Sequence, residues 1–208
     1  SGGTLTLSSN DDAIHADGKA CVSGGTVTVL RSYEGIEGNT VEIAGGSVSV
    51  IASDDGLNAT ATEGTGITVS GGTLYVLAGG DGVDSNSQTQ YSGILFAGGR
   101  SVIISTGRAD SSIDTERGYK YTGGYVVGIG LSGGMGNEST MCQNFTSVGK
   151  KTTLNLASGS YLSVSGIVTV KMPSAMNALV VLLGSTSADI SVGGQISGLD
   201  GNGVAWEK

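Results

Sequence analysis

The chain has 208 residues, of which 38 are glycine and one is proline, and its formal net charge is −8. This negative charge argues against nucleic acid and anionic membrane surfaces as partners. No stretch approaches the roughly 18 consecutive apolar residues that a membrane span requires. The length is sufficient for one elongated domain and a small second one.

A double glycine followed by a short alternation of hydroxyl and aliphatic residues recurs six times along the chain. The glycine pairs begin at residues 2, 24, 45, 71, 98 and 123, at intervals of 21 to 27 residues. A period of this length that carries strands but no helix-length segment is typical of a β-solenoid, in which each repeat forms one coil. We therefore expect a parallel β-helix of about five to six coils over residues 1–128.

Each repeat also predicts which residues face inward, because apolar residues alternate with polar ones. Equivalent residues of successive coils stack about 4.8 Å apart, so one inward residue per coil forms a column of like side chains. The expected inward columns are Ala20, Val41, Ile67, Ile94, Tyr119; Val22, Ile43, Val69, Phe96, Tyr121; and Ile14, Ile36, Leu57, Val83, Ile113.

The repeat lapses after Gly128, although the β character continues. Residues 129–149 are rich in glycine, serine and methionine and are predicted to form a loop, whereas residues 150–208 contain irregular strands. An uncovered solenoid end would expose strand edges and core, so we predict that residues 150–208 form a β cap or small β-subdomain. Trp206 is expected to cover core in this segment rather than to bind sugar.

Acidic residues concentrate at one corner of the repeat. Asp12, Glu34, Asp55 and Asp81 each lie nine residues after the second glycine of a pair, and His15, Glu37, Asn58 and Asp84 follow three residues later. In the fifth coil, an apparent insertion shifts the equivalent apolar residue to Ile113, which Asp114 follows. With Asp11, Asp17, Asp54, Asp110 and Glu116, this corner holds 12 of the 18 acids of the chain.

Stacked carboxylates about 5 Å apart repel each other by roughly 3 kcal/mol at an effective dielectric constant near 20. Such columns need bound cations, or else open solvent and raised pKa values. Carboxylates, an asparagine amide and backbone carbonyls are the hard oxygen ligands that calcium prefers. The alternative is a solvated acidic face that only keeps the protein soluble. His15 is expected to be a solvent-facing turn residue rather than a ligand.

The repeats resemble a known family in the segments Asp-Asp-Ala-Ile-His-Ala-Asp-Gly, Ser-Tyr-Glu-Gly-Ile-Glu, Ser-Asp-Asp-Gly-Leu-Asn-Ala and Gly-Asp-Gly-Val-Asp-Ser-Asn. That family comprises carbohydrate-binding, polysaccharide-lyase-like β-helices secreted by anaerobic bacteria. The resemblance implies an all-β, right-handed parallel β-helix, a secreted or cell-surface location with the export signal outside this chain, and adhesin-like binding of cellulose or polygalacturonate. It also implies calcium as cofactor, and by motif position the calcium ligands would be Asp12, Glu34, Glu37, Asp55, Asn58, Asp81 and Asp84. The fifth coil departs from the motif, with Ser111 and Ser112 in place of Asp-Gly.

Two functions from different classes remain open at this point. The first is a calcium-dependent polysaccharide-binding module without catalytic residues, for which Tyr33 and Tyr75 are the candidate aromatic platforms. The second is a calcium-dependent, pectate-type polysaccharide lyase, in which Arg108, Arg117 or Lys120 would remove the proton beside the uronate carboxyl. The sequence does not determine the oligomeric state.

Overall fold

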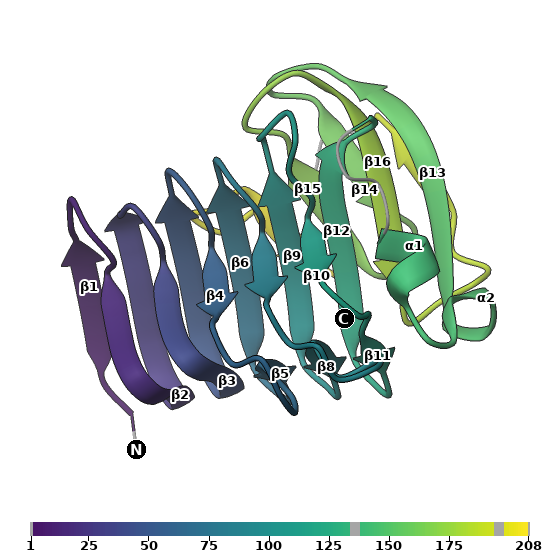
Figure 1. Cartoon of the computed structure of the whole chain (residues 1–208). Helices are drawn as coiled ribbons and strands as arrows, with labels where there is room; N and C mark the ends of the chain where they lie inside the picture. Colours follow the sequence, from purple (N-terminus) through teal and green to yellow (C-terminus); the bar gives the residue numbers. More distant parts are fainter. Residues whose placement is uncertain (1, 134–137, 194–197, 208) are drawn as a thin grey trace.

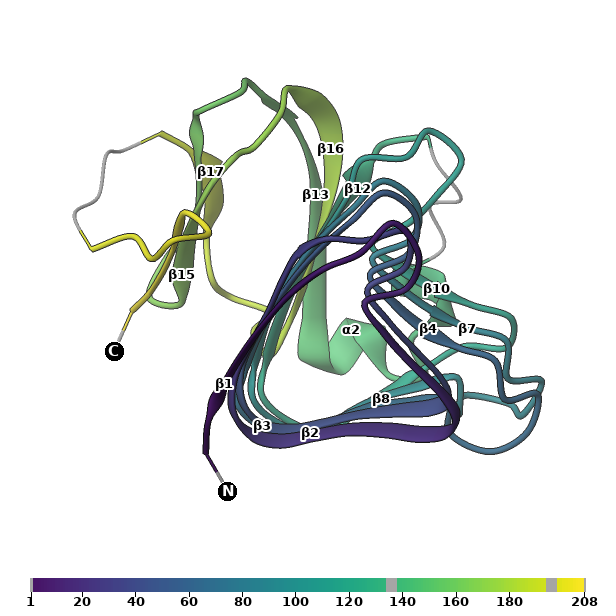
Figure 2. The same ribbon diagram turned by 90° about the vertical axis from the view of Figure 1, so that its left-hand side faces the viewer.

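The computed structural model describes residues 2–133, 138–193 and 198–207. It is all-β, and its main body is a β-solenoid of about five turns with parallel strand pairing (Figure 1), which confirms the predicted fold class. Figure 2 views the solenoid along its axis and shows that each coil has three sides, which meet at corners.

We call the side that carries the acidic corner the acidic side. It contains the first residues of two long, bent strands, β2 (Ile14–Arg31) and β3 (Ile36–Ala52), followed by β4 (Leu57–Ala59), β7 (Val83–Ser85) and β10 (Ile113–Thr115). The second side contains the middle of β2 and β3 with β5 (Ile67–Val69), β8 (Ile94–Phe96) and β11 (Lys120–Tyr121). The third side contains β1 (Thr4–Ser8), the ends of β2 and β3, β6 (Thr73–Ala78), β9 (Arg100–Ser105) and β12 (Tyr125–Leu131).

The strand registers confirm the predicted inward columns. Val41 pairs with Ala20 and Ile67, and Ile36 pairs with Ile14 and Leu57. The side chains of these columns are largely buried and form the core of the solenoid. Near the C-terminal end of this core, Phe96 contacts Tyr119 edge-to-face, with ring centroids 6.0 Å apart. Stacking like on like in this way buries apolar area in every coil, which is the main stabilising contribution to a solenoid.

The recurring glycine pair forms the corner that leads into the third side. Its second glycine has a positive φ, such as +86° at Gly46, a conformation that favours glycine. A Cβ on Gly46 would also lie 2.5 Å from the carbonyl oxygen of Gly25 in the preceding coil. The glycine pair is therefore required both by the turn and by the close stacking of the coils.

The solenoid ends in antiparallel strands. On the third side, β12 pairs antiparallel with β16 (Met176–Leu183), which pairs antiparallel with β13 (Gly149–Leu156). Two short helices, α1 (Glu138–Met141) and α2 (Phe145–Val148), lie at this end of the solenoid (Figure 1), within the stretch predicted as a loop. Residues 134–137 of that predicted loop lie outside the described residues.

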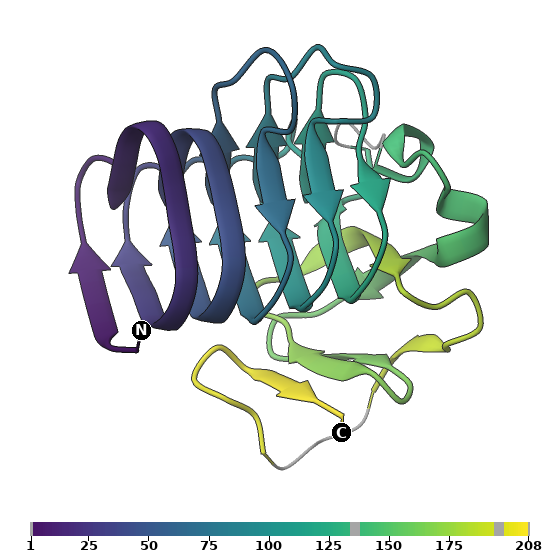
Figure 3. The same cartoon turned by 90° about the horizontal axis from the view of Figure 1, so that it is seen from below.

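A second sheet lies alongside the third side (Figure 3). It is antiparallel, and its strands in spatial order are β17 (Ile190–Val192), β14 (Tyr161–Val164), β15 (Val168–Lys171) and β18 (Val204–Trp206). It encloses a second core with outward-facing residues of β6, β9 and β12, including Val102, Ile104 and Ile129.

This second core changes the interpretation of two aromatic residues. Tyr75 is 8% exposed, so the expectation that it forms an exposed sugar platform is wrong, because the small sheet covers it. Trp206 packs against the same core, as expected, and Arg100 lies over its ring at 5.7 Å. None of the helices in the described ranges is long and apolar enough to cross a membrane.

Candidate functional site

The acidic side brings the predicted site residues into two parallel columns. The strand column is His15, Glu37, Asn58, Asp84 and Asp114, whose members are paired in register from coil to coil. The turn column is Asp12, Glu34, Asp55 and Asp81, in the turns before the strands. All seven predicted metal ligands are half-buried, and each coil from the first to the fourth contributes to both columns.

The glycine that follows most of the turn-column acids has a packing reason. A Cβ on Gly56 would lie 2.2 Å from Val76 Cγ1, and one on Gly82 would lie 2.3 Å from Ile103 Cγ2. The backbone next to each acid therefore runs directly over the apolar core. This contact fixes where the neighbouring carboxylate projects.

The fifth coil departs from this arrangement, as its sequence predicts. The Gly82 N–H donates to the Ser111 carbonyl at 2.9 Å, so Ser111 occupies the place of an acid and Ser112 that of a glycine. Ser112 fits because the core residue below it is Gly128, which pairs with Ile103; a Cβ on Gly128 would lie 2.6 Å from Ser112 Oγ. The fifth coil therefore contributes Asp114 to the strand column but no acid to the turn column.

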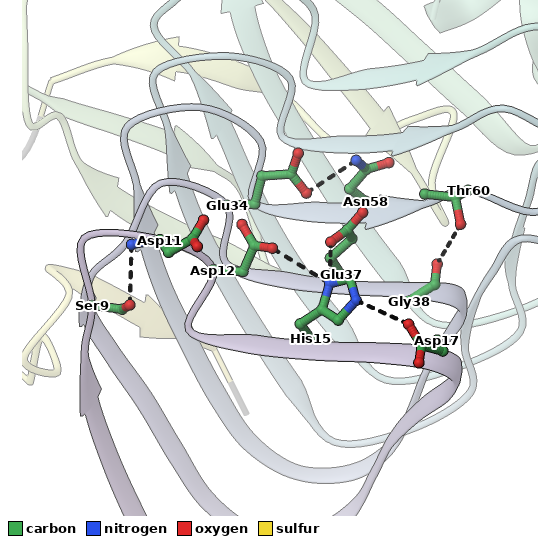
Figure 4. Close-up of polar contacts among 10 residues, drawn as sticks. All are labelled: Ser9, Asp11, Asp12, His15, Asp17, Glu34, Glu37, Gly38, Asn58 and Thr60. Atoms are coloured by element: carbon green, nitrogen blue, oxygen red, sulfur yellow. Dashed lines mark hydrogen bonds and ion pairs between the residues drawn. The ribbon is translucent and has the colours of Figure 1, made fainter.

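In the first two coils, His15 is solvent-facing, as expected, but it lies in β2 rather than in a turn and belongs to the strand column. Its Nδ1 hydrogen-bonds Glu37 Oε2 and lies 3.5 Å from Asp12 Oδ2, while its Nε2 lies 3.5 Å from Asp17 Oδ1 (Figure 4). These carboxylates raise the pKa of the His15 imidazole, chiefly through the hydrogen bond to Glu37. Potential ligand atoms of Asp12, His15 and Glu37 lie within 4.8 Å of one another. The register of His15 with Glu37 could have revealed this group from the repeat alignment.

The second and third coils are joined by a side-chain contact. Asn58 Nδ2 donates to Glu34 Oε2 at 3.0 Å, as Figure 4 shows, which leaves Asn58 Oδ1 buried without a hydrogen-bond partner. A buried polar atom without a partner is costly, and most such atoms in native proteins bind another group, water or an ion.

Between the third and fifth coils, the turn-column carboxylates accept backbone hydrogen bonds. Asp55 Oδ1 accepts from the Asp81 N–H at 2.7 Å, and Asp81 Oδ1 accepts from the Ser111 N–H at 2.5 Å. A Cβ on Gly80 would lie 2.6 Å from Asp55 Oδ1, so the glycine leaves space for this carboxylate. These contacts hold one oxygen of each acid in place.

Burial and mutual repulsion make the ionised form of these acids costly. Loss of solvent is the main cause, and neighbouring carboxylates add to it. Together they raise the pKa of Glu34 to about 7, of Asp55 to about 6, of Asp81 to about 8 and of Asp84 to about 7. The same two causes raise the pKa of Asp114. Without a compensating positive charge, the columns therefore hold protons near neutral pH.

Sequence reasoning missed one further acid at the end of the columns. Glu138 of α1 is 2% exposed; its Oε1 accepts a hydrogen bond from Ser112 Oγ at 3.3 Å, and its Oε2 has no partner. Burial raises the pKa of this carboxyl. Glu138 lies outside the repeat, so no periodic signal could have placed it there.

The donor set fits a hard divalent cation. It combines half-buried carboxylates, whose negative charges lack a neighbouring positive charge, with the partnerless Asn58 Oδ1. Carboxylate and amide oxygens are both ligands that calcium takes. The residues that would hold calcium are those predicted: Asp12, Glu34, Glu37, Asp55, Asn58, Asp81 and Asp84. Bound calcium would supply the positive charge that keeps these acids ionised.

The possible lyase bases lie in the fifth coil. Arg108 and Arg117 are exposed and Lys120 is half-buried. In the described part of the chain, ion pairs are formed instead by His15 and by Lys19, which contacts Glu42.

Comparison with known proteins gives one match. The model of a family described as carbohydrate-binding domain-containing protein matches residues 1–181. No curated protein and no solved structure matches the chain. The family match extends over the solenoid, including both acidic columns, and over β13, β14, β15 and most of β16. The chain therefore belongs to the family of carbohydrate-binding domain-containing proteins.

Proposed function

We propose that this protein is a non-catalytic, extracellular module that binds calcium along its acidic side and, through the calcium, an acidic polysaccharide such as polygalacturonate. The observation that carries the proposal is the pair of half-buried acidic columns, one of which contains the partnerless Asn58 Oδ1. Family membership supports carbohydrate as the ligand.

Calcium resolves an electrostatic conflict in this proposal. A chain with a net charge of −8 repels an acidic polymer, and the acidic side repels it most strongly. Cations that are held partly by protein carboxylates keep coordination positions for uronate carboxylates and sugar hydroxyls. The metal thus provides both folding stability and attraction for the ligand.

The shape of the site favours a polymer over a small molecule. The two columns extend along several coils of the solenoid and form a long surface rather than a closed pocket. An adhesin-like role on the surface of a bacterium agrees with such a surface. Cellulose, which carries no charge, is the second candidate ligand and would contact calcium through hydroxyls alone.

Calorimetric titration of chelator-treated protein with calcium tests the metal, with magnesium as the control cation. We expect calcium-selective binding in the wild type and weakened binding in Asp55→Asn. Asp189→Asn is the matched control, because it removes the same charge from an exposed acid that directly precedes β17 of the small sheet. Equal heats for both cations, or no heat, would contradict the proposal.

Retention on immobilised polygalacturonate, with and without calcium, tests the ligand. We expect retention that chelator abolishes, with no absorbance from the 4,5-unsaturated product that a lyase would release. Product that disappears in Arg108→Gln, Arg117→Gln or Lys120→Gln would establish the lyase alternative instead.

A further inference from the structure

The corner between the third side and the acidic side contains a groove of about 300 Å³ that none of the sequence motifs predicts. It is lined by Asn10, Arg31, Tyr33, Ile51 and Ser53, among others. Tyr33 is followed directly by Glu34 of the turn column, and Ser53 precedes Asp55 by two residues. The groove therefore adjoins the proposed calcium-binding surface.

Arg31, the last residue of β2, provides a positive charge in this groove. Its Nη2 donates to Asn10 Oδ1 at 2.9 Å, a neutral amide rather than a carboxylate. Within the described ranges, the ion pairs involve only His15 and Lys19, so Arg31 has no carboxylate partner there. A guanidinium with free donors binds a carboxylate in a planar, two-pronged geometry.

Tyr33 and Ile51 provide an apolar surface beside that charge. Tyr33 is 51% exposed and Ile51 is 39% exposed, and both line the groove. The neighbouring Asp54 carboxylate raises the pKa of the Tyr33 phenol. An aromatic ring offers an apolar face to the C–H groups of a sugar, and with two side-chain torsions it loses little entropy on binding.

The combination of an arginine and a tyrosine in this groove occurs in one coil. The equivalent corner segments 8–12, 52–55, 78–81 and 105–111 do not combine an arginine with a tyrosine. The acidic columns repeat from coil to coil, whereas this pair occurs once. A repeated surface alone gives no fixed register for a polymer, and a single distinct position would supply one.

We propose that the groove is a subsite for one uronate residue, with its carboxylate on Arg31 and its ring against Tyr33 and Ile51. This inference rests on the proposed function and extends it, because it selects an acidic polysaccharide over cellulose. The uronate in the groove sets the register with which the following sugars meet the acidic side.

The test measures the affinity of a short galacturonate oligomer in saturating calcium, with its methyl-esterified form as the uncharged probe. Arg31→Gln should weaken galacturonate binding about tenfold and leave binding of the ester unchanged, since the lost interaction is with a charged group. Tyr33→Ala should weaken both probes, whereas Tyr33→Phe should resemble the wild type. Lys171→Gln, which removes an exposed positive charge from β15 of the small sheet, is the matched control and should have no effect.

Calcium affinity and melting temperature of every variant are measured alongside, and both should be unchanged. Wild-type affinity in Arg31→Gln and Tyr33→Ala would overturn the subsite while leaving the proposed function intact. Equal losses in Arg31→Gln and Lys171→Gln would overturn it in favour of general charge attraction. Loss of calcium affinity in Arg31→Gln would also overturn it, because the effect would then act through the metal. Failure of the wild type to bind any probe would contradict the proposed function itself.

Discussion

Asn58 donates a hydrogen bond to Glu34 across neighbouring coils at 3.0 Å and leaves its own Oδ1 buried and without a partner. The amide thus stabilises the ionised form of Glu34, while its oxygen adds a neutral ligand to a row of acids. Asn58 is the neutral member of the predicted ligand set, and it separates Glu37 from Asp84 in the strand column. It therefore reduces repulsion at the centre of that column.

Asn58→Asp should reverse this effect. In chelator, the new carboxylate stacks between Glu37 and Asp84 and is repelled by both. We expect the free energy of unfolding to fall by about 1 kcal/mol, which is less than the repulsion between two carboxylates in a protein interior because the site is half-exposed. In calcium, the added negative ligand should raise calcium affinity. Thermal melts with and without calcium measure both effects. A loss of equal size under both conditions would contradict the role of Asn58 as a ligand.

Asp55→Asn should lower the melting temperature in calcium but not in chelator. Asparagine keeps the oxygen that accepts from the Asp81 N–H but removes the negative charge. Calcium at a hundredfold excess over its Kd stabilises the native state by about 2.7 kcal/mol, and the variant should lose part of that amount. Asp189→Asn should behave as the wild type. Equal destabilisation in both media would indicate a packing role.

Stability in chelator should fall as the pH rises from about 4 to about 8. Aspartate and glutamate titrate near 4 in an unfolded chain, whereas Asp55 titrates at about 6 and Asp81 at about 8 in the folded protein. The folded state thus binds more protons in this window, so its stability is fully present below about pH 4 and is lost as the pH passes the folded values. Calcium should flatten this slope and release protons on binding. Melts across pH, and calorimetry in buffers of different ionisation enthalpy, measure the two effects. A flat profile in chelator would refute the prediction.

Glu138→Gln should stabilise the protein at pH 7 to 8 and have little effect near pH 4. The variant removes a buried carboxylate whose Oε2 has no partner and keeps an oxygen that can accept from Ser112. We expect the gain at the higher pH because burial raises the pKa of the Glu138 carboxyl and makes its ionised form costly. Glu63→Gln, at an exposed position, is the control. A gain that does not depend on pH would argue against a charge effect.

Gly56→Ala should destabilise the fold by about 1 to 3 kcal/mol, in the range measured for overpacked cores. Its Cβ would lie 2.2 Å from Val76 Cγ1 and 2.5 Å from the Gly82 carbonyl oxygen. Gly18→Ala is the matched control, because no atom lies within 4 Å of the corresponding Cβ. Denaturant unfolding measures both variants. Equal free energies of unfolding for the two variants would show that neighbouring coils can move apart to accommodate the added methyl group.

The repeat made the solenoid and its acidic columns predictable. The alignment of Ile36 with Leu57 fixes the register, and this register then places Glu37 beside Asn58. Even the irregular fifth coil was readable, since Ile113 and Asp114 pair with Val83 and Asp84 as expected.

Features outside the period could not be predicted in the same way. The contact of β16 with β12 joins segments of opposite direction and different pattern, and no periodic signal specifies it. The alternation of apolar and polar residues places Tyr75 on the outside of the solenoid. It is buried only because the small sheet, which lies far away in the sequence, covers it. The position of Glu37 beside His15 follows from the register, whereas the contacts of His15 with Asp12 and Asp17 depend on side-chain conformations that residue spacing does not determine.

The reversal of strand direction at β12 and β16 has a consequence for evolution and engineering. A parallel coil cannot be added beyond β12, because its edge is already occupied by β16, so any new coil must enter on the N-terminal side of β12. Each coil inserted between the third coil and β12 would lengthen the acidic side by about 4.8 Å and leave the Arg31 corner and the terminal sheet unchanged. The number of coils thus determines the length of the acidic side, and antiparallel pairing fixes the C-terminal end of the solenoid.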